Sequence, residues 1–136
     1  ALVTALGDGD PKVVQNSVIA LAEISARYFK DDRAYRPLVR QLDSADALTR
    51  LWAVRATVTL RGAASFPDVL PLARDRSAKV RGEVVRVVID LARRSDLAAD
   101  ARSQLRALAS TAATDTDGQV REFAANLAAA VGSQTG

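Results

Sequence analysis

The sequence predicts an all-α fold built from about four stacked pairs of helices. The main observation is an apolar stripe in residues 77–94, at offsets 0, +4, +7, +8 and +11, which is the spacing of a helix that buries one face. Its members are Val80, Val84, Val87, Val88 and Leu91. Small or apolar residues recur at these offsets after Val13, Thr49 and Val120. The four anchors are 36, 31 and 40 residues apart, so one helical unit is used four times.

No segment predicts a strand, because the β-branched residues follow helical rather than alternating spacing. The order is short helix, turn, long helix, and each pair is too small to cover its own apolar face, so the pairs must stack. We expect one repeat domain over residues 1–136, with units at about 1–29, 33–62, 65–94 and 97–131. Because residues 1–6 read as a helical fragment without an initiator Met, we also expect a segment of a longer array.

The first half of the chain carries clear helix boundaries. Asp10 as N-cap and Pro11 at the first helical position start a helix that runs to about Tyr28. A shorter helix follows at residues 33–42 with Pro37 inside it, and a turn at residues 43–46 leads into a long helix at 47–61 that Gly62 ends.

The second half repeats this order. A short helix opens near Phe66 and carries Pro71, and a turn at residues 74–77 leads into the long helix of residues 77–94. Further helices are expected at 97–112 and 119–131, separated by a polar turn.

The composition excludes several functions. The chain has 136 residues with no Cys, His or Met, so disulfides, thiolate metal sites and a histidine base are not available. It carries 19 basic and 16 acidic residues, and a net charge of +3 is too small to diagnose a nucleic-acid binder. No stretch is apolar enough to span a bilayer, and we expect a soluble, cytoplasmic protein.

Close carboxylate pairs are the remaining candidates for chemistry. Asp8 with Asp10, Asp31 with Asp32, and Asp115 with Asp117 would suit a cation or an acid and base. Each pair stands at an expected helix start, where Asp caps free backbone amides, and capping is the preferred interpretation. We therefore expect no enzyme activity, no cofactor and no metal.

The chain resembles the HEAT repeats, a family of helical hairpins, over roughly residues 8–131. The resemblance rests on Pro67 with Asp75 and Val80-Arg81, and on Asp115 with Val120-Arg121. It implies a right-handed α-α superhelix and a ladder of hydrogen bonds between successive units, formed by Asp75 with Arg81 and Asp115 with Arg121. The first two units depart from the pattern, with Val14 where Arg is expected and Ser44 six residues before Arg50.

Two surfaces are candidates for binding. The first, which we call the concave strip, lies on the side of the long helices away from the apolar stripe. It consists of Leu51 at offset +2, Ile19, Arg55 and Arg86 at offset +6, and Val58 and Ile89 at offset +9. An apolar floor with two arginines is typical of a protein-binding groove, unless tighter curvature buries it. The second, the arginine stripe, consists of Arg33, Arg36 and Arg40 on one helix face.

The preferred function is a scaffold that binds a protein partner on the concave strip. The alternative is a nucleic-acid-binding solenoid that uses the arginine stripe, although no aromatic residue interleaves it on that helix face and Asp31 and Asp32 lie close by in the sequence.

Two further expectations concern packing. Trp52 and Phe123 occupy offset +3, on the flank of the long helix, where each should pack against the preceding unit. The last helix should carry an apolar outer face that permits self-association, with Phe123, Ala124, Leu127 and Ala130 on it.

Overall fold

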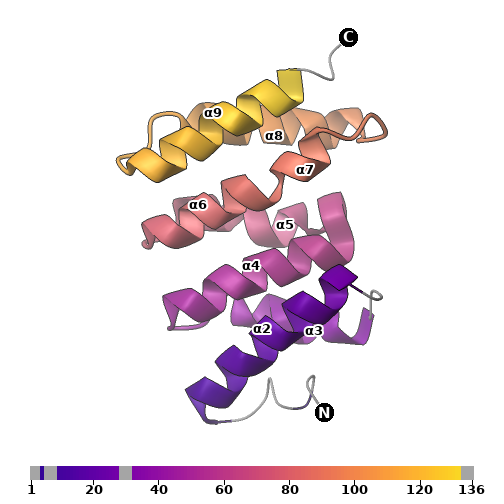
Figure 1. Cartoon of the computed structure of the whole chain (residues 1–136), viewed down its shortest axis with the longest axis vertical. Helices are drawn as coiled ribbons and strands as arrows, with labels where there is room; N and C mark the ends of the chain where they lie inside the picture. Colours follow the sequence, from indigo (N-terminus) through magenta and orange to yellow (C-terminus); the bar gives the residue numbers. More distant parts are fainter. Residues whose placement is uncertain (1–3, 5–8, 28–31, 133–136) are drawn as a thin grey trace. The chain divides into compact units, whose positions relative to one another are not determined.

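The protein was studied as a computed structural model, which describes Thr4, residues 9–27 and residues 32–132. These residues form helices and no strand, so the predicted all-α class is confirmed (Figure 1). The helix expected at residues 1–6 lies outside the described residues apart from Thr4, which is helical. The chain divides into two compact units, Ala1–Val69 and Leu70–Gly136, and the boundary falls within the third expected hairpin.

The described part of unit 1 contains three longer helices, a 3-10 turn and a single-turn helix. They are α2 (Pro11–Arg27), α3 (Asp32–Gln41) and α4 (Ala47–Arg61), followed by the 3-10 turn η1 (Gly62–Ser65) and the single-turn α5 (Phe66–Val69). Helices α2 and α4 lie side by side, and α3 packs against α4 from behind (Figure 1). Val18, Leu38, Val54, Phe66 and Val69 are fully buried and form the apolar core of this unit.

Helix α4 begins and ends where the sequence predicted, and both ends are capped. The Asp46 side chain accepts a hydrogen bond from the backbone N–H of Thr49 at 2.9 Å, which satisfies a free amide of the first turn. Gly62 has φ +54°, a region that favours glycine, and its N–H donates to the carbonyl of Val58.

Unit 2 contains the 3-10 segment η2 (Leu70–Arg74), α6 (Ala78–Val87), the single-turn α7 (Ile89–Ala92), α8 (Ala99–Ala112) and α9 (Gly118–Gly132). Helices α6 and α9 lie side by side, and α8 packs behind α9 (Figure 1). The core of this unit includes Val80, Val84, Leu105 and Leu127, all with less than 2% exposure.

Three differences from the predicted elements exceed one residue. The long helix expected at residues 77–94 is interrupted at Val88, within a run of β-branched residues that disfavour helix. The short helix that opens at Phe66 continues as 3-10 turns from Leu70, because Pro71 has no backbone N–H to donate. The helix expected from Leu97 begins at Ala99.

The apolar stripe of α4 contains two buried threonines. Thr57 has no solvent exposure, and its hydroxyl donates to the carbonyl of Ala53 at 2.8 Å. The Thr49 hydroxyl donates to Asp46 at 2.7 Å. A threonine can therefore replace an apolar residue in the stripe, because its hydroxyl is satisfied within its own helix or at its cap.

Candidate functional site

The exposed side of α4 carries large apolar side chains. Leu48 is 46% exposed, and Leu51, Trp52 and Arg55 are half-buried. These four residues, which we call the α4 face, are spaced i, i+3, i+4 and i+7 and therefore share one side of the helix. Val58, the third residue that α4 contributes to the concave strip, is only 4% exposed. The exposed side of α4 therefore includes Trp52, which the sequence analysis placed on the flank, and excludes Val58.

Trp52 and Arg55 form a stacked pair on this face. The guanidinium carbon of Arg55 lies 4.1 Å from the centroid of the Trp52 ring, within the range of a cation–π interaction. The stack places a planar cation over an aromatic ring and covers part of both groups. Trp52 was expected to pack against the preceding hairpin. It is half-buried, so such packing covers only part of its side chain.

The other members of the concave strip have different surroundings. Ile19 is half-buried on α2, the helix beside α4. Ile89, in unit 2, is only 8% exposed. Burial of Val58 and Ile89 agrees with the alternative that the strip is partly enclosed by the fold, and it removes both side chains from the accessible surface.

Arg86 in unit 2 is held by its own helix. Its Nε and Nη2 donate to the two carboxylate oxygens of Glu83 at 2.9 and 2.6 Å, and the Glu83 side chain is only 5% exposed. The hydrogen bond to Glu83 raises the pKa of Arg86 above its ordinary value. The charge of Arg86 is therefore balanced within α6, whereas the sequence suggested an anchor for the carboxylate of a partner.

The arginine stripe lies on α3, where Arg33, Arg36 and Arg40 are all exposed. Tyr35 stands between them in the sequence but is only 8% exposed. Its hydroxyl donates to Asp68 at 2.7 Å, and the guanidinium carbon of Arg61 lies 4.4 Å from its ring centroid. Burial and the bond to Asp68 raise the pKa of Tyr35 to about 12. Tyr35 is therefore part of the packing of unit 1 and offers no ring for a base to stack on.

The same geometry joins three arginines to the turns that precede their helices. Nη1 of Arg50, Arg81 and Arg121 donates to the backbone carbonyl six residues earlier, in Ser44, Asp75 and Asp115, at 2.8, 2.9 and 2.7 Å. Arg81 also donates from Nε and Nη2 to both carboxylate oxygens of Asp115, at 2.9 and 3.0 Å. This bidentate pair connects α6 to the turn before α9, and it lowers the pKa of Asp115 below its ordinary value.

Unit 1 uses an amide where unit 2 uses an arginine. Val14, at the expected arginine position, is buried, and the neighbouring Gln15 donates from Nε2 to Asp46 at 2.9 Å. The pKa of Asp46 is lowered, first by the hydrogen bond from the Thr49 hydroxyl. Gln15 was not predicted because the expected pattern has an arginine at a fixed position, whereas a polar donor one residue later reaches the carboxylate that caps the next long helix.

Arg102 on α8 was also missed by the sequence reasoning. It is only 8% exposed, and it donates from Nη1 to the carbonyl of Ala92 at 3.2 Å and from Nη2 to the carbonyl of Arg94 at 2.8 Å. These are the last carbonyls of α7 and of the turn after it, which lack partners within the helix. The structural function of Arg102 is therefore to cap the C-terminal end of α7 from the neighbouring helix α8.

Asp115 and Asp117 serve as caps within unit 2. Asp115 accepts from the backbone N–H of Asp117 at 2.9 Å, and Asp117 accepts from that of Val120 at 3.1 Å. Among the described residues, no three acidic, cysteine or histidine side chains gather in a way that could hold a metal ion. The described helices also include none that is both long and apolar enough to cross a membrane.

The prediction of an apolar outer face on α9 is wrong for three of its residues. Ala124, Leu127 and Ala130 are 1%, 0% and 7% exposed, because they face the interior of unit 2. Phe123 is half-buried, and its ring lies against Gly82 of α6, as expected for a residue that packs on the preceding hairpin.

The fold is similar to that of engineered helical repeat proteins. A designed armadillo repeat protein in complex with the peptide (KR)4 matches with a TM-score of 0.71 and 21% identity, over 96% of this chain and 62% of that protein. Another designed armadillo repeat protein gives 0.67 and 22%, over 96% and 63%. An engineered protein from a structural genomics project gives 0.69 and 20%, over 96% and 60%.

This chain therefore spans about three fifths of the length of these proteins. The likeness shows an α-helical repeat fold. The sequence matches no protein-family model and no curated protein.

Proposed function

We propose that this chain is a non-catalytic repeat scaffold that binds a protein partner through the α4 face. The observation that carries the proposal is an exposed Leu48 next to Leu51 and the Trp52–Arg55 stack. Tryptophan and arginine are the residue types at which binding energy concentrates in protein interfaces, and exposed apolar patches with a polar rim mark such interfaces.

The α4 face defines the chemistry of its partner. Leu48, Leu51 and the uncovered part of Trp52 would pack against apolar side chains of a peptide. The Arg55 guanidinium is already oriented over the ring, so less side-chain freedom is lost when a partner orders the surface. Ile19 is half-buried on α2, the helix that packs beside α4. The complex of one designed armadillo neighbour with a peptide is consistent with this use of the fold.

We also infer that the repeats are of the HEAT type and that residues 1–136 form one repeat domain. Two-helix hairpins such as α3–α4 and α8–α9, the proline inside α3, and the Arg81–Asp115 pair support this inference.

Selection from a random peptide library displayed on phage, followed by titration of the selected peptides, tests the proposal. Leu48→Ser and Trp52→Ala should each weaken binding about tenfold or more, since both remove contact area at the centre of the face. Arg93→Ala is the matched control, because its side chain is 63% exposed and lies in unit 2. Peptides that bind all three variants as well as wild type would contradict the proposal.

Nucleic-acid binding through the arginine stripe is the second candidate, because all three of its side chains are exposed. Replacement of Arg33, Arg36 and Arg40 by Gln should then weaken binding to a random DNA duplex and reduce the salt dependence by about one unit for each lost phosphate contact. Tight duplex binding that is lost in this variant and kept by Trp52→Ala would replace the scaffold function with this one.

A further inference from the structure

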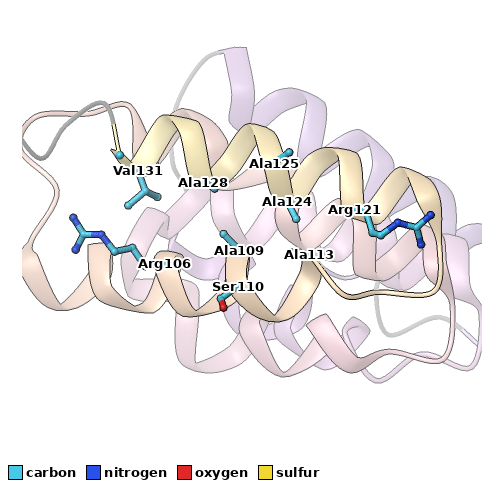
Figure 2. Close-up of a pocket in the computed structure, with 10 residues that line it drawn as sticks. Arg106, Ala109, Ser110, Ala113, Arg121, Ala124, Ala125, Ala128 and Val131 are labelled. Atoms are coloured by element: carbon cyan, nitrogen blue, oxygen red, sulfur yellow. The ribbon is translucent and has the colours of Figure 1, made fainter.

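A hollow lies between α8 and α9 in unit 2 (Figure 2). Its volume is about 480 Å³. Its walls are formed mainly by small apolar side chains: Ala109, Ala113, Ala124, Ala125, Ala128 and Val131. Ala113, Ala125 and Ala128 are exposed, so the hollow opens to solvent.

The walls fit the close approach of another helix. Alanine side chains let two helix axes come within roughly 8 Å, the lower end of the usual range. Along α9, the hollow extends from Arg121 to Val131, which corresponds to about 15 Å at 1.5 Å per residue. This length accommodates about three helical turns.

A positive charge stands at each end of the hollow. Figure 2 shows Arg106 beside Val131 at one end and Arg121 at the other. Arg106 is exposed and makes no ion pair within the part of the chain that the structure describes. Arg121 is exposed and gives Nη1 to the backbone carbonyl of Asp115, so other N–H groups of its guanidinium are available. No acidic residue lines the hollow.

We propose that this hollow binds an acidic amphipathic helix of a partner protein. Apolar side chains of that helix would fill the alanine-lined floor, and two carboxylates would pair with Arg106 and Arg121. Residues eleven positions apart lie on one face of a helix and about 16 Å apart, which matches the length of the hollow. This surface belongs to unit 2 and does not depend on the function proposed for the α4 face.

A synthetic helical peptide tests the proposal on the whole chain. The probe is an alanine-rich peptide of about sixteen residues, blocked at both ends, with two glutamates eleven positions apart and two leucines between them on the same face. A second peptide carries lysines in place of the glutamates. We expect the glutamate peptide to bind about tenfold more tightly than the lysine peptide, with the difference shrinking at high salt.

Variants of the chain locate the site. Arg106→Glu and Arg121→Glu should each weaken the glutamate peptide about fivefold, and the double variant should bind the lysine peptide better than the wild type does. Ala128→Phe, which fills the exposed side of the hollow, should abolish binding of both peptides. Lys79→Glu applies the same change of charge on α6 and is the control that should leave binding unchanged. Circular dichroism verifies that each variant keeps its helix content.

Three outcomes would overturn the proposal. One is equal affinity for the glutamate and lysine peptides, and another is binding that survives Ala128→Phe. The third is a wild-type chain that binds neither peptide but forms a concentration-dependent dimer, with the dimer lost in Ala128→Phe. A second copy of the chain would then be the occupant of the hollow.

Discussion

Trp52 has two roles: it contributes to the packing of unit 1, and it is partly accessible on the α4 face. Trp52→Ala should therefore lower the free energy of unfolding by about 1 to 2 kcal/mol, less than the roughly 3 to 5 kcal/mol expected for a fully buried aromatic residue. Phe66→Ala is the matched comparison, since Phe66 is 1% exposed in the same unit. Urea denaturation measures both, and equal losses would show that Trp52 is a core residue.

Arg102 tests how much a buried cation at a helix end stabilises the fold. Arg102→Met keeps most of the side-chain volume but leaves the carbonyls of Ala92 and Arg94 without their donors. A loss of about 1 to 3 kcal/mol in the free energy of unfolding should follow. Arg106→Met, an exposed position on the same helix, should change it by less than about 0.5 kcal/mol. A similar effect of both substitutions in denaturant titrations would contradict the capping role.

The Arg81–Asp115 pair predicts a pH dependence. The pKa of Asp115 is lowered from its ordinary value of 3.8, mainly by the hydrogen bond from Arg81. A lowered pKa in the folded state means that the stabilisation is present above 3.8 and is lost as the pH falls through the lower folded value. The stability difference between wild type and Asp115→Asn should therefore be constant from about pH 7 to pH 5 and shrink toward pH 3.

The control for this titration is Asp90→Asn. The Asp90 side chain is 93% exposed, and its ion pair with Arg93 is 3.4 Å long, so the substitution should cost little at either pH. If the difference in the free energy of unfolding between wild type and Asp115→Asn grew as the pH falls, the prediction would be contradicted.

At the scale of elements, α6 and α9 meet where Phe123 lies over Gly82. A Cβ atom at Gly82 would lie 3.5 Å from the ring of Phe123, an ordinary contact distance. Gly82→Ala should therefore leave stability unchanged or raise it by up to about 1 kcal/mol, because glycine disfavours helix. Gly82→Leu should lower it by about 1 to 3 kcal/mol, since the larger side chain must displace the ring. Thermal unfolding of both variants gives the two signs, and destabilisation by Gly82→Ala would contradict this packing.

The element boundaries that the sequence predicted well are those with local chemistry. Asp46 and Gly62 bound α4, because a cap and a left-handed glycine act within a few residues. The interruption at Val88 and the 3-10 turns after Leu70 were not predicted. The helical spacing continues through both segments, and periodicity alone does not register the low helix propensity of β-branched residues or the missing amide of Pro71.

The candidate site was predicted less well than the elements. The helix faces were placed at fixed offsets, and the observed α4 face differs by one position, with Trp52 accessible and Val58 buried. Which of two adjacent positions is covered depends on packing between helices, which an isolated pattern does not contain. Gln15 and Arg102 show the same limit, since tertiary geometry brings them to Asp46 and to the carbonyls of Ala92 and Arg94. The Arg86–Glu83 pair differs, because it joins residues three positions apart on one helix and could have been read from the sequence.

At the scale of the whole molecule, each compact unit has an apolar core of its own. Leu38 in unit 1 and Leu127 in unit 2 are both completely buried. In repeat folds, stability is a sum of local contributions and nearest-neighbour terms, so a defect should act mainly on the unit that contains it. Leu127→Ala should cost about 2 to 5 kcal/mol in the protection of the α9 amides against hydrogen exchange and much less in those of α4.

Leu38→Ala is the reciprocal variant, and it should reduce the protection of α4 by a similar amount while largely sparing α9. Hydrogen exchange followed by mass spectrometry reads both units in one sample, so the two substitutions are compared under identical conditions. If each substitution lowered the protection of both units equally, the 136 residues would unfold in one cooperative step, and the separation into two compact units would have no counterpart in stability.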